Sequence, residues 1–386
     1  MKNLVFTLSV PSAYFKSALD FPILPKHILG SVSPELLLEH TFSNKPIGSG
    51  PFVYNHTQSI GTAGEKIVYL QANQKYYKNA PLLNSFIVHA FLDKTAIVTA
   101  LNNGTVTASG EIDGEFLDKI DKTNLNEKQT AVNYGVFAFL NMDRLSSRDL
   151  RQALRQGVNL KTVRENLAGV TPLDYPILDS QIQLDYPKLP EYDRSASEKT
   201  IKSLLEQNTE LDKTGIVIAT LKSGSLPKVS EKIASEIRSL GLKAEVVAYD
   251  PGQDFIINTL APRNYDILVY EIGLGANPDV FAYYHSSNAT QNGHNLSNYR
   301  NTVVSDLVLS ARSTMNQDLR AKKYERFLGY FVNDVPAIGL YRSGMNYFSN
   351  KNIRSYSQEN RLVTPTDRLQ DVYRWGIEKT TKNRTP

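Results

Sequence analysis

Few side chains in this sequence form the patterns that catalysis or metal binding requires. The six histidines include no HExxH sequence and no pair four residues apart, so the converging ligands of a zinc site are not indicated. Three acids cluster in EIDGE (111–115). Paired carboxylates can hydrolyse glycosides, but acids interleaved with glycines are more typical of a solvated turn. The chain has no cysteine, which excludes thiol nucleophiles and thiolate-bound metals. We expect no catalytic residue, no metal and no cofactor.

Two other segments carry better candidates for ligand contact. Tyr134 and Phe137 lie in an alternating apolar segment, which either packs in a core or forms the wall of a binding cleft. The segment Glu271–Asp279 (EIGLGANPD) follows an expected strand, and its glycines permit close backbone approach. Loops at the carboxyl ends of strands line the crevice of open α/β sheets. This segment is therefore either a binding loop or a plain connection.

Composition narrows the class of protein. Apolar residues make up 41% of the 386, which is too many for a disordered chain and enough for two domains. The net charge of +4, from 43 basic and 39 acidic residues, is too dilute to indicate a nucleic-acid partner. No apolar run approaches the roughly 20 residues that a membrane-spanning helix needs.

The secondary structure expected around these residues is of the α/β class. A strand at 215–221, a helix at 228–240 with one apolar face, and a strand at 242–249 predict a βαβ unit with a parallel pair. Alternation over residues 4–9 predicts a strand at the start of the chain. Ser146 with Asp149 predicts one helix start, and Ser195 with Glu198 predicts a capping box at another. Further strands are expected at 66–72, 85–90, 265–271 and 337–341, and helices at 94–102, 304–314 and 317–332.

Nine segments, in order along the chain, resemble the sequence pattern of one family. For example, NKPIGSGPFVY (44–54) is similar to NPVGTGPYKF, and DLRQALRQGVN (149–159) is similar to RVRQALSYAID. The other segments lie at 21–29, 72–82, 192–205, 233–246, 265–281, 319–341 and 367–375. By these segments the chain resembles the extracytoplasmic solute-binding proteins of family 5, the peptide-, dipeptide- and nickel-binding group of ABC importers.

The resemblance implies a two-lobed periplasmic-binding-protein-like fold (type II, cluster C) with lobe I incomplete. Residues 1–131 would begin lobe I, 132–342 would form lobe II, and 343–386 would return to lobe I. This matches the changes of sequence character near 131–133 and 342–344. The resemblance further implies that the chain is the C-terminal portion of an extracytoplasmic, lipid-anchored protein. It would be a monomer that holds peptides or a related solute between its lobes for a membrane permease, without catalysis and without nucleic acid.

The same resemblance implies which residues contact the ligand. Family members place an aspartate, which pairs with the ligand's ammonium group, where this chain has Leu274, and a tryptophan where it has Glu271. A leucine cannot neutralise a buried cation, so Glu271 is the expected charge anchor if the ligand is cationic. Asp306 matches a family aspartate that we expect to be structural. The full set of expected ligand contacts is Tyr134, Phe137, Glu271, Gly273, Leu274, Asn277, Asp279, Tyr283, His285 and Asn295.

Two other functions remain open at this point. The same fold can form the ligand-sensing domain of a transcription regulator, which predicts a DNA-binding segment upstream. It can also carry an enzyme, which predicts a nucleophile with its base or a carboxylate pair. The sequence contains no such pattern.

Overall fold

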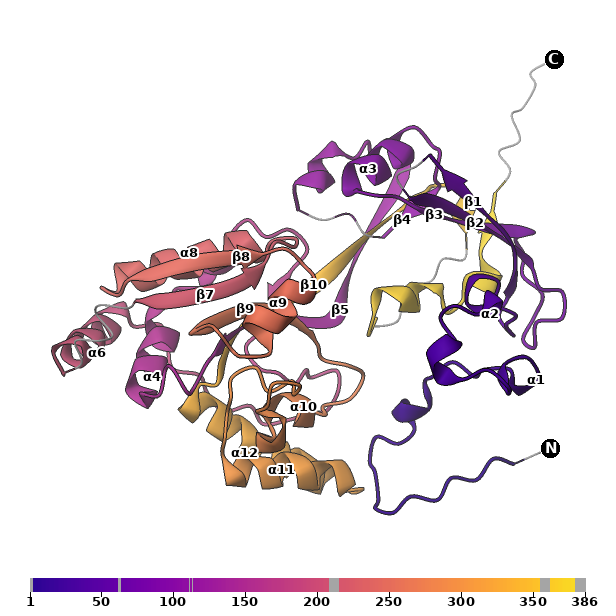
Figure 1. The fold of residues 1–386 in the computed structure, drawn as a ribbon. Helices are drawn as coiled ribbons and strands as arrows, with labels where there is room; N and C mark the ends of the chain where they lie inside the picture. The colour runs from indigo at the N-terminus through magenta and orange to yellow at the C-terminus, as the bar shows by residue number, and fades with distance from the viewer. Residues whose placement is uncertain are drawn as a thin grey trace. The chain divides into compact units, whose positions relative to one another are not determined.

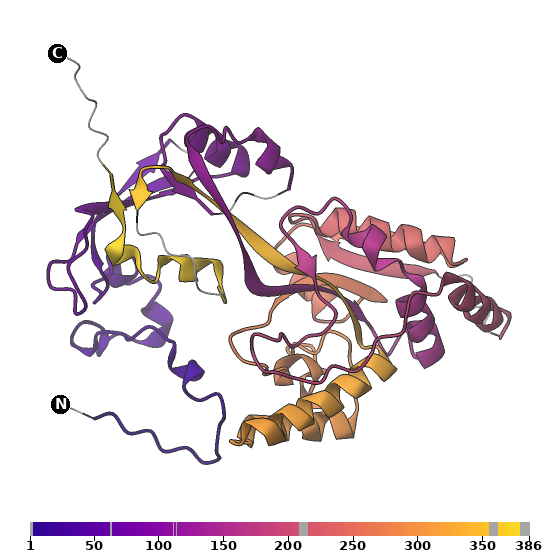
Figure 2. The same ribbon diagram turned by 180° about the vertical axis from the view of Figure 1, so that it is seen from behind.

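The computed structural model describes residues 3–61, 64–110, 112, 114–207, 215–354 and 362–378. The chain divides into two compact units: unit 1 is Met1–Asp20 with Asn133–Ser343, and unit 2 is Phe21–Val132 with Gly344–Pro386. The chain crosses between them inside two long strands, β5 (Leu125–Leu140) and β10 (Ala337–Asn350), which lie side by side (Figure 2). The crossings fall between residues 132 and 133 and between residues 343 and 344.

Unit 1 is built on a mixed sheet in the order β10-β5-β9-β7-β8. The predicted βαβ unit is confirmed: β7 (Ile216–Leu221) and β8 (Ala244–Tyr249) are parallel and joined by α8 (Leu226–Ser239). The buried face of α8 carries Val229, Ile233 and Ile237 at helical spacing. Strand β9 (Ile267–Gly273) runs parallel to β7 and antiparallel to β5.

The sheet is covered by helices on both faces (Figure 1). One apolar cluster joins Val136, Ala138 and Leu140 of β5 to α4 (Arg148–Gly157), α6 (Arg194–Gln207) and α8. The other joins Phe137 and Phe139 of the same strand to α11 (Thr302–Ser313) and α12 (Gln317–Asp334). Successive side chains of a strand point to opposite faces, so β5 supplies both cores.

Two helix starts differ from the expected ones. The hydroxyl of Ser147, one residue after the predicted Ser146, accepts the N–H of Leu150 and caps α4. The carboxylate of Asp193 accepts the N–H of Ala196 at 2.9 Å, so α6 begins at Arg194 and the capping box predicted at Ser195 is wrong. An aspartate just before the helix satisfies a free N–H of the first turn, and this sets the earlier start.

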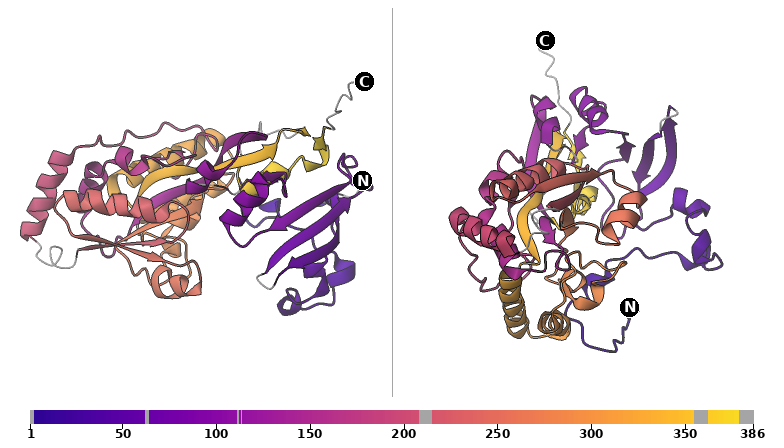
Figure 3. Two further views of the ribbon diagram at one scale, coloured as in Figure 1. Left: turned by 90° about the horizontal axis from the view of Figure 1, so that it is seen from above. Right: turned by 60° about the vertical axis from the view of Figure 1, so that its left-hand side comes forward.

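Unit 2 contains an antiparallel sheet of β1 (Phe52–Ile60), β2 (Glu65–Ala72) and β3 (Ser85–Ala90), seen in indigo and violet in Figure 3. Helix α3 (Lys94–Asn102) packs Val98 and Leu101 against Phe348 of β10 in a separate small core. None of the described helices is long and apolar enough to cross a membrane.

The strand predicted at residues 4–9 is wrong. Leu4 and Val5 are more than 80% exposed and the segment forms no ladder with any described residue. An alternating segment becomes a strand only where another strand pairs with it. Glu111 and Asp113 of the acidic cluster lie outside the described residues.

The remaining short elements complete the structure. They are α1 (Lys26–Leu29), α2 (Thr41–Asn44), β4 (Ala108–Ser109), α5 (Leu160–Arg164), β6 (Thr171–Pro172), α9 (Gln253–Phe255), α10 (Phe281–Tyr284), β11 (Ile353–Arg354) and β12 (Gly376–Ile377).

Candidate functional site

The end of β9 leaves part of its backbone without a neighbouring strand. The strand pairs with β5 over its whole length, but with β7 only from Ile267 to Val269. From Tyr270 to Gly273 it therefore has a ladder partner on one side only, among the residues that the structure describes. A strand edge of this kind can accept an extended peptide as an additional strand.

The side chain of Glu271 stands at this free edge. It is exposed, and one of its carboxylate oxygens accepts a hydrogen bond from the hydroxyl of Ser343. Ser343 is the last residue of unit 1 before β10 continues into unit 2. Among the described residues, the contact printed for the carboxylate of Glu271 is therefore with a neutral hydroxyl.

Two tyrosines flank the last residue of β9. Tyr134 lies opposite Gly273 in the β5–β9 ladder, and a methyl group on Gly273 would lie 3.7 Å from its ring. The hydroxyl of Tyr283 donates to the carbonyl oxygen of Gly273 at 3.1 Å. Burial raises the pKa of Tyr283, so it stays a neutral donor. Three expected contacts, Tyr134, Gly273 and Tyr283, are thus brought together.

The loop after β9 is held by residues that the sequence analysis missed. The side-chain nitrogen of Gln181 lies 2.7, 3.1 and 2.9 Å from the carbonyl oxygens of Leu274, Gly275 and Asn277. The amide of Asn133 donates to the carbonyl of Gly275 at 2.7 Å. These partners are 93 to 142 residues apart in sequence, so no local pattern could have indicated them.

Asn133 also connects the loop to the second crossing. Its backbone carbonyl accepts the N–H of Leu274 at 2.7 Å, and its side-chain oxygen accepts a hydrogen bond from Arg342 at 2.5 Å. Asn133 and Arg342 lie at the two points where the chain passes between the units. The loop is therefore hydrogen-bonded directly to the first crossing and, through Asn133, to the second.

Three expected ligand contacts lie in the interior of unit 1. Phe137 and Asn295 have no exposed surface, and Leu274 is 7% exposed. Phe137 and Leu274 pack in the core beside α11 and α12, and Asn295 bonds to the backbone of His285 and Tyr299. Because their surfaces are covered by unit 1 itself, we correct these three to structural positions and do not retain them as ligand contacts.

Asp279 and His285 are engaged in a chain of contacts beyond the loop. The carboxylate of Asp279 accepts the N–H of Phe281 at 3.2 Å and pairs with Arg312 at 3.0 Å. The guanidinium of Arg312 lies 4.6 Å from the centre of the Phe281 ring, which stacks on His285 at 4.3 Å. Burial is the main cause that lowers the pKa of His285. These contacts fix α10 to α11, and the carboxylate of Asp279 is paired with a cation of unit 1 itself.

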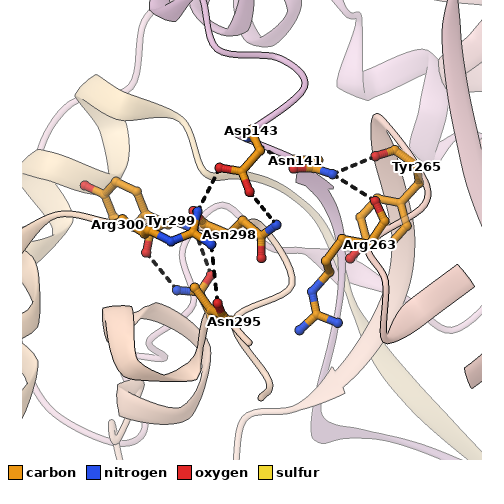
Figure 4. Close-up of polar contacts among 9 residues, drawn as sticks. Asn141, Asp143, Arg263, Tyr265, Asn295, Asn298, Tyr299 and Arg300 are labelled. Carbon is orange, nitrogen blue, oxygen red and sulfur yellow. Dashed lines mark hydrogen bonds and ion pairs between the residues drawn. The ribbon is translucent and has the colours of Figure 1, made fainter. Parts of the chain in front are cut away.

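A network of polar contacts joins the residues that follow β5 to the segments 263–265 and 295–300 (Figure 4). The amide of Asn141 donates to the carbonyls of Arg263 and Tyr265 at 3.0 and 2.9 Å. Asp143 accepts hydrogen bonds from Asn298 at 2.8 Å and Arg300 at 2.7 Å. Asn141 and Asp143 follow β5 directly, so this network ties the 295–300 segment to the end of the central strand. Among the described residues, no three histidine, aspartate or glutamate side chains gather in a metal-binding arrangement.

Comparison with known proteins finds one family. The family model described as "Bacterial extracellular solute-binding proteins, family 5 Middle" matches residues 2–295. The chain is 26% identical over 392 residues to the "Oligopeptide-binding protein AppA" of Bacillus subtilis (strain 168), an alignment that covers 95% of this chain and 69% of that protein. The chain thus spans about two thirds of that relative's length.

Solved structures agree on the fold. The oligopeptide-binding protein AppA from Bacillus subtilis, solved in complex with a nonapeptide, superposes with a TM-score of 0.75 at 22% identity and covers 97% of this chain and 76% of that one. NikZ from Campylobacter jejuni, in complex with Ni(L-His), superposes with a TM-score of 0.76 at 22% identity and covers 96% and 76%. At these identities the likeness concerns the fold, and it confirms the predicted fold class.

Proposed function

The chain belongs to the bacterial extracellular solute-binding proteins of family 5, and from that premise we propose that it captures oligopeptides for an ABC importer without altering them chemically. One observation carries the proposal: Tyr270–Gly273 form a strand edge that β7 does not pair. The proposal is supported by the Bacillus subtilis relative, which is an oligopeptide-binding protein and was solved with a nonapeptide.

The edge suits an extended peptide backbone. Main-chain N–H and C=O groups bind any sequence alike, and pockets for alternate side chains supply selectivity. Gly273 ends the edge without a side chain of its own, between Tyr134 and Tyr283. Two amphipathic rings beside a bare backbone can contact apolar side chains of a peptide, while the hydroxyl of Tyr283 holds the carbonyl of Gly273 in place.

We further propose that Glu271 binds the peptide's ammonium group. Its carboxylate is exposed and is bonded to the neutral hydroxyl of Ser343, so its charge is not neutralised by that contact. A hydrogen bond to a charged group is worth about 1.5–3 kcal/mol. Since 1.4 kcal/mol is a factor of ten in binding, loss of the charge should weaken a cationic peptide roughly 10-fold or more.

The test is to compare binding of one peptide with a free and with an acetylated N-terminus, by isothermal titration calorimetry. The peptide is chosen by native mass spectrometry of the purified protein, which identifies any peptide that co-purifies. Glu271→Gln should weaken the free peptide about 10-fold and leave the acetylated one unchanged. Glu245→Gln, at an exposed position of β8, is the matched control and should change neither.

Two results would separate the parts of this proposal. If both peptide forms bind Glu271→Gln as they bind the unmodified protein, Glu271 is not the anchor, although the protein still binds peptides. If no peptide of any length binds, and none co-purifies, the peptide-capture proposal itself fails.

The proposal also includes the lobe assignment, the oligomeric state and the cellular location of the protein. We assign Asn133–Ser343 to lobe II and the described residues after Asp20 outside that range to lobe I, and we propose a monomer whose partner is a membrane permease. The full protein would be extracytoplasmic and lipid-anchored, and would have no enzymatic activity. Light scattering coupled to size exclusion tests the monomer, and a mass near twice 43.2 kDa would contradict it.

A further inference from the structure

Residues 3–10, which we call the arm, are extended and open to solvent in unit 1. Every side chain of the arm is exposed, and Leu4 and Val5 are more than 80% exposed. The arm forms no ladder with any described residue, and the ring of Phe6 lies 5.2 Å from the ring of Phe15. Because burial of apolar surface is favourable, the arm keeps apolar side chains that another surface of the protein could cover.

The chain is attached to unit 1 directly after the arm. The N–H of Ala13 donates to the carbonyl of Arg312 in the last turn of α11 at 2.8 Å. The hydroxyls of Tyr14 and Tyr324 lie 2.7 Å apart, which adds a contact with α12. Between the arm and this attachment, residues 11 and 12 belong to no helix or strand. The arm is therefore a segment fixed at one end by contacts with α11 and α12.

Two side chains of α10 connect this attachment to the free edge of β9. The hydroxyl of Tyr283 donates to the carbonyl of Gly273 at 3.1 Å, and the ring of Phe281 lies 4.6 Å from the guanidinium of Arg312. A helix with its side chains is roughly 10–12 Å wide, so about one helix separates Gly273 from that guanidinium. Residues 3–12 extend over about 33 Å, which is long enough to cross this distance and lie along the edge.

The side chains of the arm match the two faces of the edge. Tyr270 and Ile272 belong to the apolar cluster beside α11 and α12, and Glu271 points to the opposite face because side chains alternate along a strand. In the arm, larger apolar residues alternate with other residues, as Leu4, Phe6 and Leu8 with Val5, Thr7 and Ser9. If the first set lies beside Tyr270, it extends the apolar cluster, and Thr7 lies on the face of Glu271. Cross-strand pairs of this kind stabilise a sheet.

We propose that the arm is an autoinhibitory strand, which pairs with Tyr270–Gly273 in the absence of ligand and is displaced when a peptide takes that edge. The inference rests on the proposed peptide-binding role of the edge. Proteins commonly cover a free strand edge with a segment of their own chain, and this arm belongs to the same unit as the edge. To close, the arm exchanges the contact of Phe6 with Phe15 for contacts beside β9.

The first test is disulfide trapping of the full chain without ligand. The chain contains no cysteine, so an introduced pair supplies its only thiols. Glu271→Cys combined with Val5→Cys or Thr7→Cys should give an intramolecular disulfide on mild oxidation, since this bond needs Cα atoms within about 7 Å. Glu245→Cys, at an exposed position of β8, combined with the same arm cysteines, is the matched control and should not. No disulfide with residue 271, or an equal yield with residue 245, would overturn the proposal.

The second test measures whether the arm competes with a peptide. Proline lacks the N–H that a paired strand needs, so Thr7→Pro should prevent pairing, whereas Thr7→Val should preserve it. Calorimetry uses the peptide identified by native mass spectrometry. Thr7→Pro should increase its affinity about 2-fold or more, because an arm that covers the edge half of the time halves the apparent affinity. Equal affinities of the two variants would refute the inhibition.

The two tests also separate this inference from the proposed function. A protein that binds the peptide but gives no disulfide with residue 271 has a working edge and no autoinhibitory arm. A protein that gives the disulfide but binds no peptide has an arm that covers the edge without a ligand to displace it. In that case the arm would be a structural strand, and the proposed autoinhibition would fail together with peptide capture.

Discussion

Two buried tyrosines of unit 1 should respond in opposite directions when each is replaced by phenylalanine. Tyr284 and Tyr265 are both fully buried in the same apolar cluster. The hydroxyl of Tyr265 donates to the carbonyl of Leu296 at 2.8 Å. The hydroxyl of Tyr284 has no partner among the described residues, and the ring of Tyr284 packs against Phe327 and Phe331. Burial also raises the pKa of Tyr284, so the phenol keeps a proton that it cannot donate.

The magnitudes follow from the partner that each hydroxyl has. A buried polar group without a hydrogen bond costs about 1–3 kcal/mol, so Tyr284→Phe should increase the free energy of unfolding by about 1 kcal/mol or more. Tyr265→Phe removes a hydrogen bond and also leaves the carbonyl of Leu296 without its partner, so it should decrease that free energy by about 1–3 kcal/mol. Both variants remove the same atom, and the two effects differ in sign because only one hydroxyl is bonded.

The assay is urea unfolding followed by two probes. The single tryptophan, Trp375, belongs to unit 2, so its fluorescence reports that unit, whereas far-UV circular dichroism includes the helices of unit 1. Both substitutions should shift the circular dichroism midpoint, in opposite directions, with an unchanged slope. If Tyr284→Phe destabilises unit 1 as much as Tyr265→Phe does, the reasoning from unpartnered hydroxyls is refuted.

Three further predictions concern the loop, a helix end and pH. Gln181→Ala should weaken peptide binding measured by calorimetry, because it releases three carbonyl groups of the loop after β9, whereas Gln183→Ala nearby should not. Arg151→Met should lower the free energy of unfolding in urea by about 1–3 kcal/mol, because it leaves the buried carbonyls at the end of α12 and before α4 without their donor; unchanged stability would contradict this. The pKa of His285 is lowered in the folded chain, so the unfolded chain binds its proton first as the pH falls. Stability should therefore decrease slightly as the pH falls through 6.5, and His285→Gln should reduce that decrease in unfolding curves measured at pH 8 and pH 5.5.

Local patterns predicted the parts of the fold that depend on local contacts. The βαβ unit was correct because the apolar face of α8 and the two apolar strands are each visible within a few residues. The capping box at Ser195 was wrong because Asp193, two residues earlier, is an equally good cap and the sequence does not rank them. The prediction of a strand at residues 4–9 was wrong because alternating residue types indicate which face a strand would bury, but they do not indicate whether another strand pairs with it.

The candidate site was predictable in position but not in detail. The glycines and the expected strand located the loop after β9. The alternating segment left open whether Phe137 packs in a core or lines a cleft, and it packs in a core. Which face α11 and α12 would cover could not be read from the strand, so Phe137 was expected at a ligand and lies in a core. Asn295 shows the same limit. A polar side chain can hydrogen-bond either to a ligand or to the protein's own backbone, and the sequence does not distinguish the two. In the structure Asn295 bonds to the backbone of Tyr299.

The loop after β9 is tied to the two places where the chain leaves unit 1. Asn133 holds Leu274 and Gly275, Arg342 holds Asn133, and Ser343 holds Glu271. A ligand that binds Glu271 can either bond to the other carboxylate oxygen or replace Ser343 at the oxygen that its hydroxyl now contacts. In the second case binding would change a contact at the last residue before the crossing. Ser343→Ala separates the two cases: it should leave the affinity for a cationic peptide unchanged if the second oxygen is used, and increase it if the hydroxyl must be displaced.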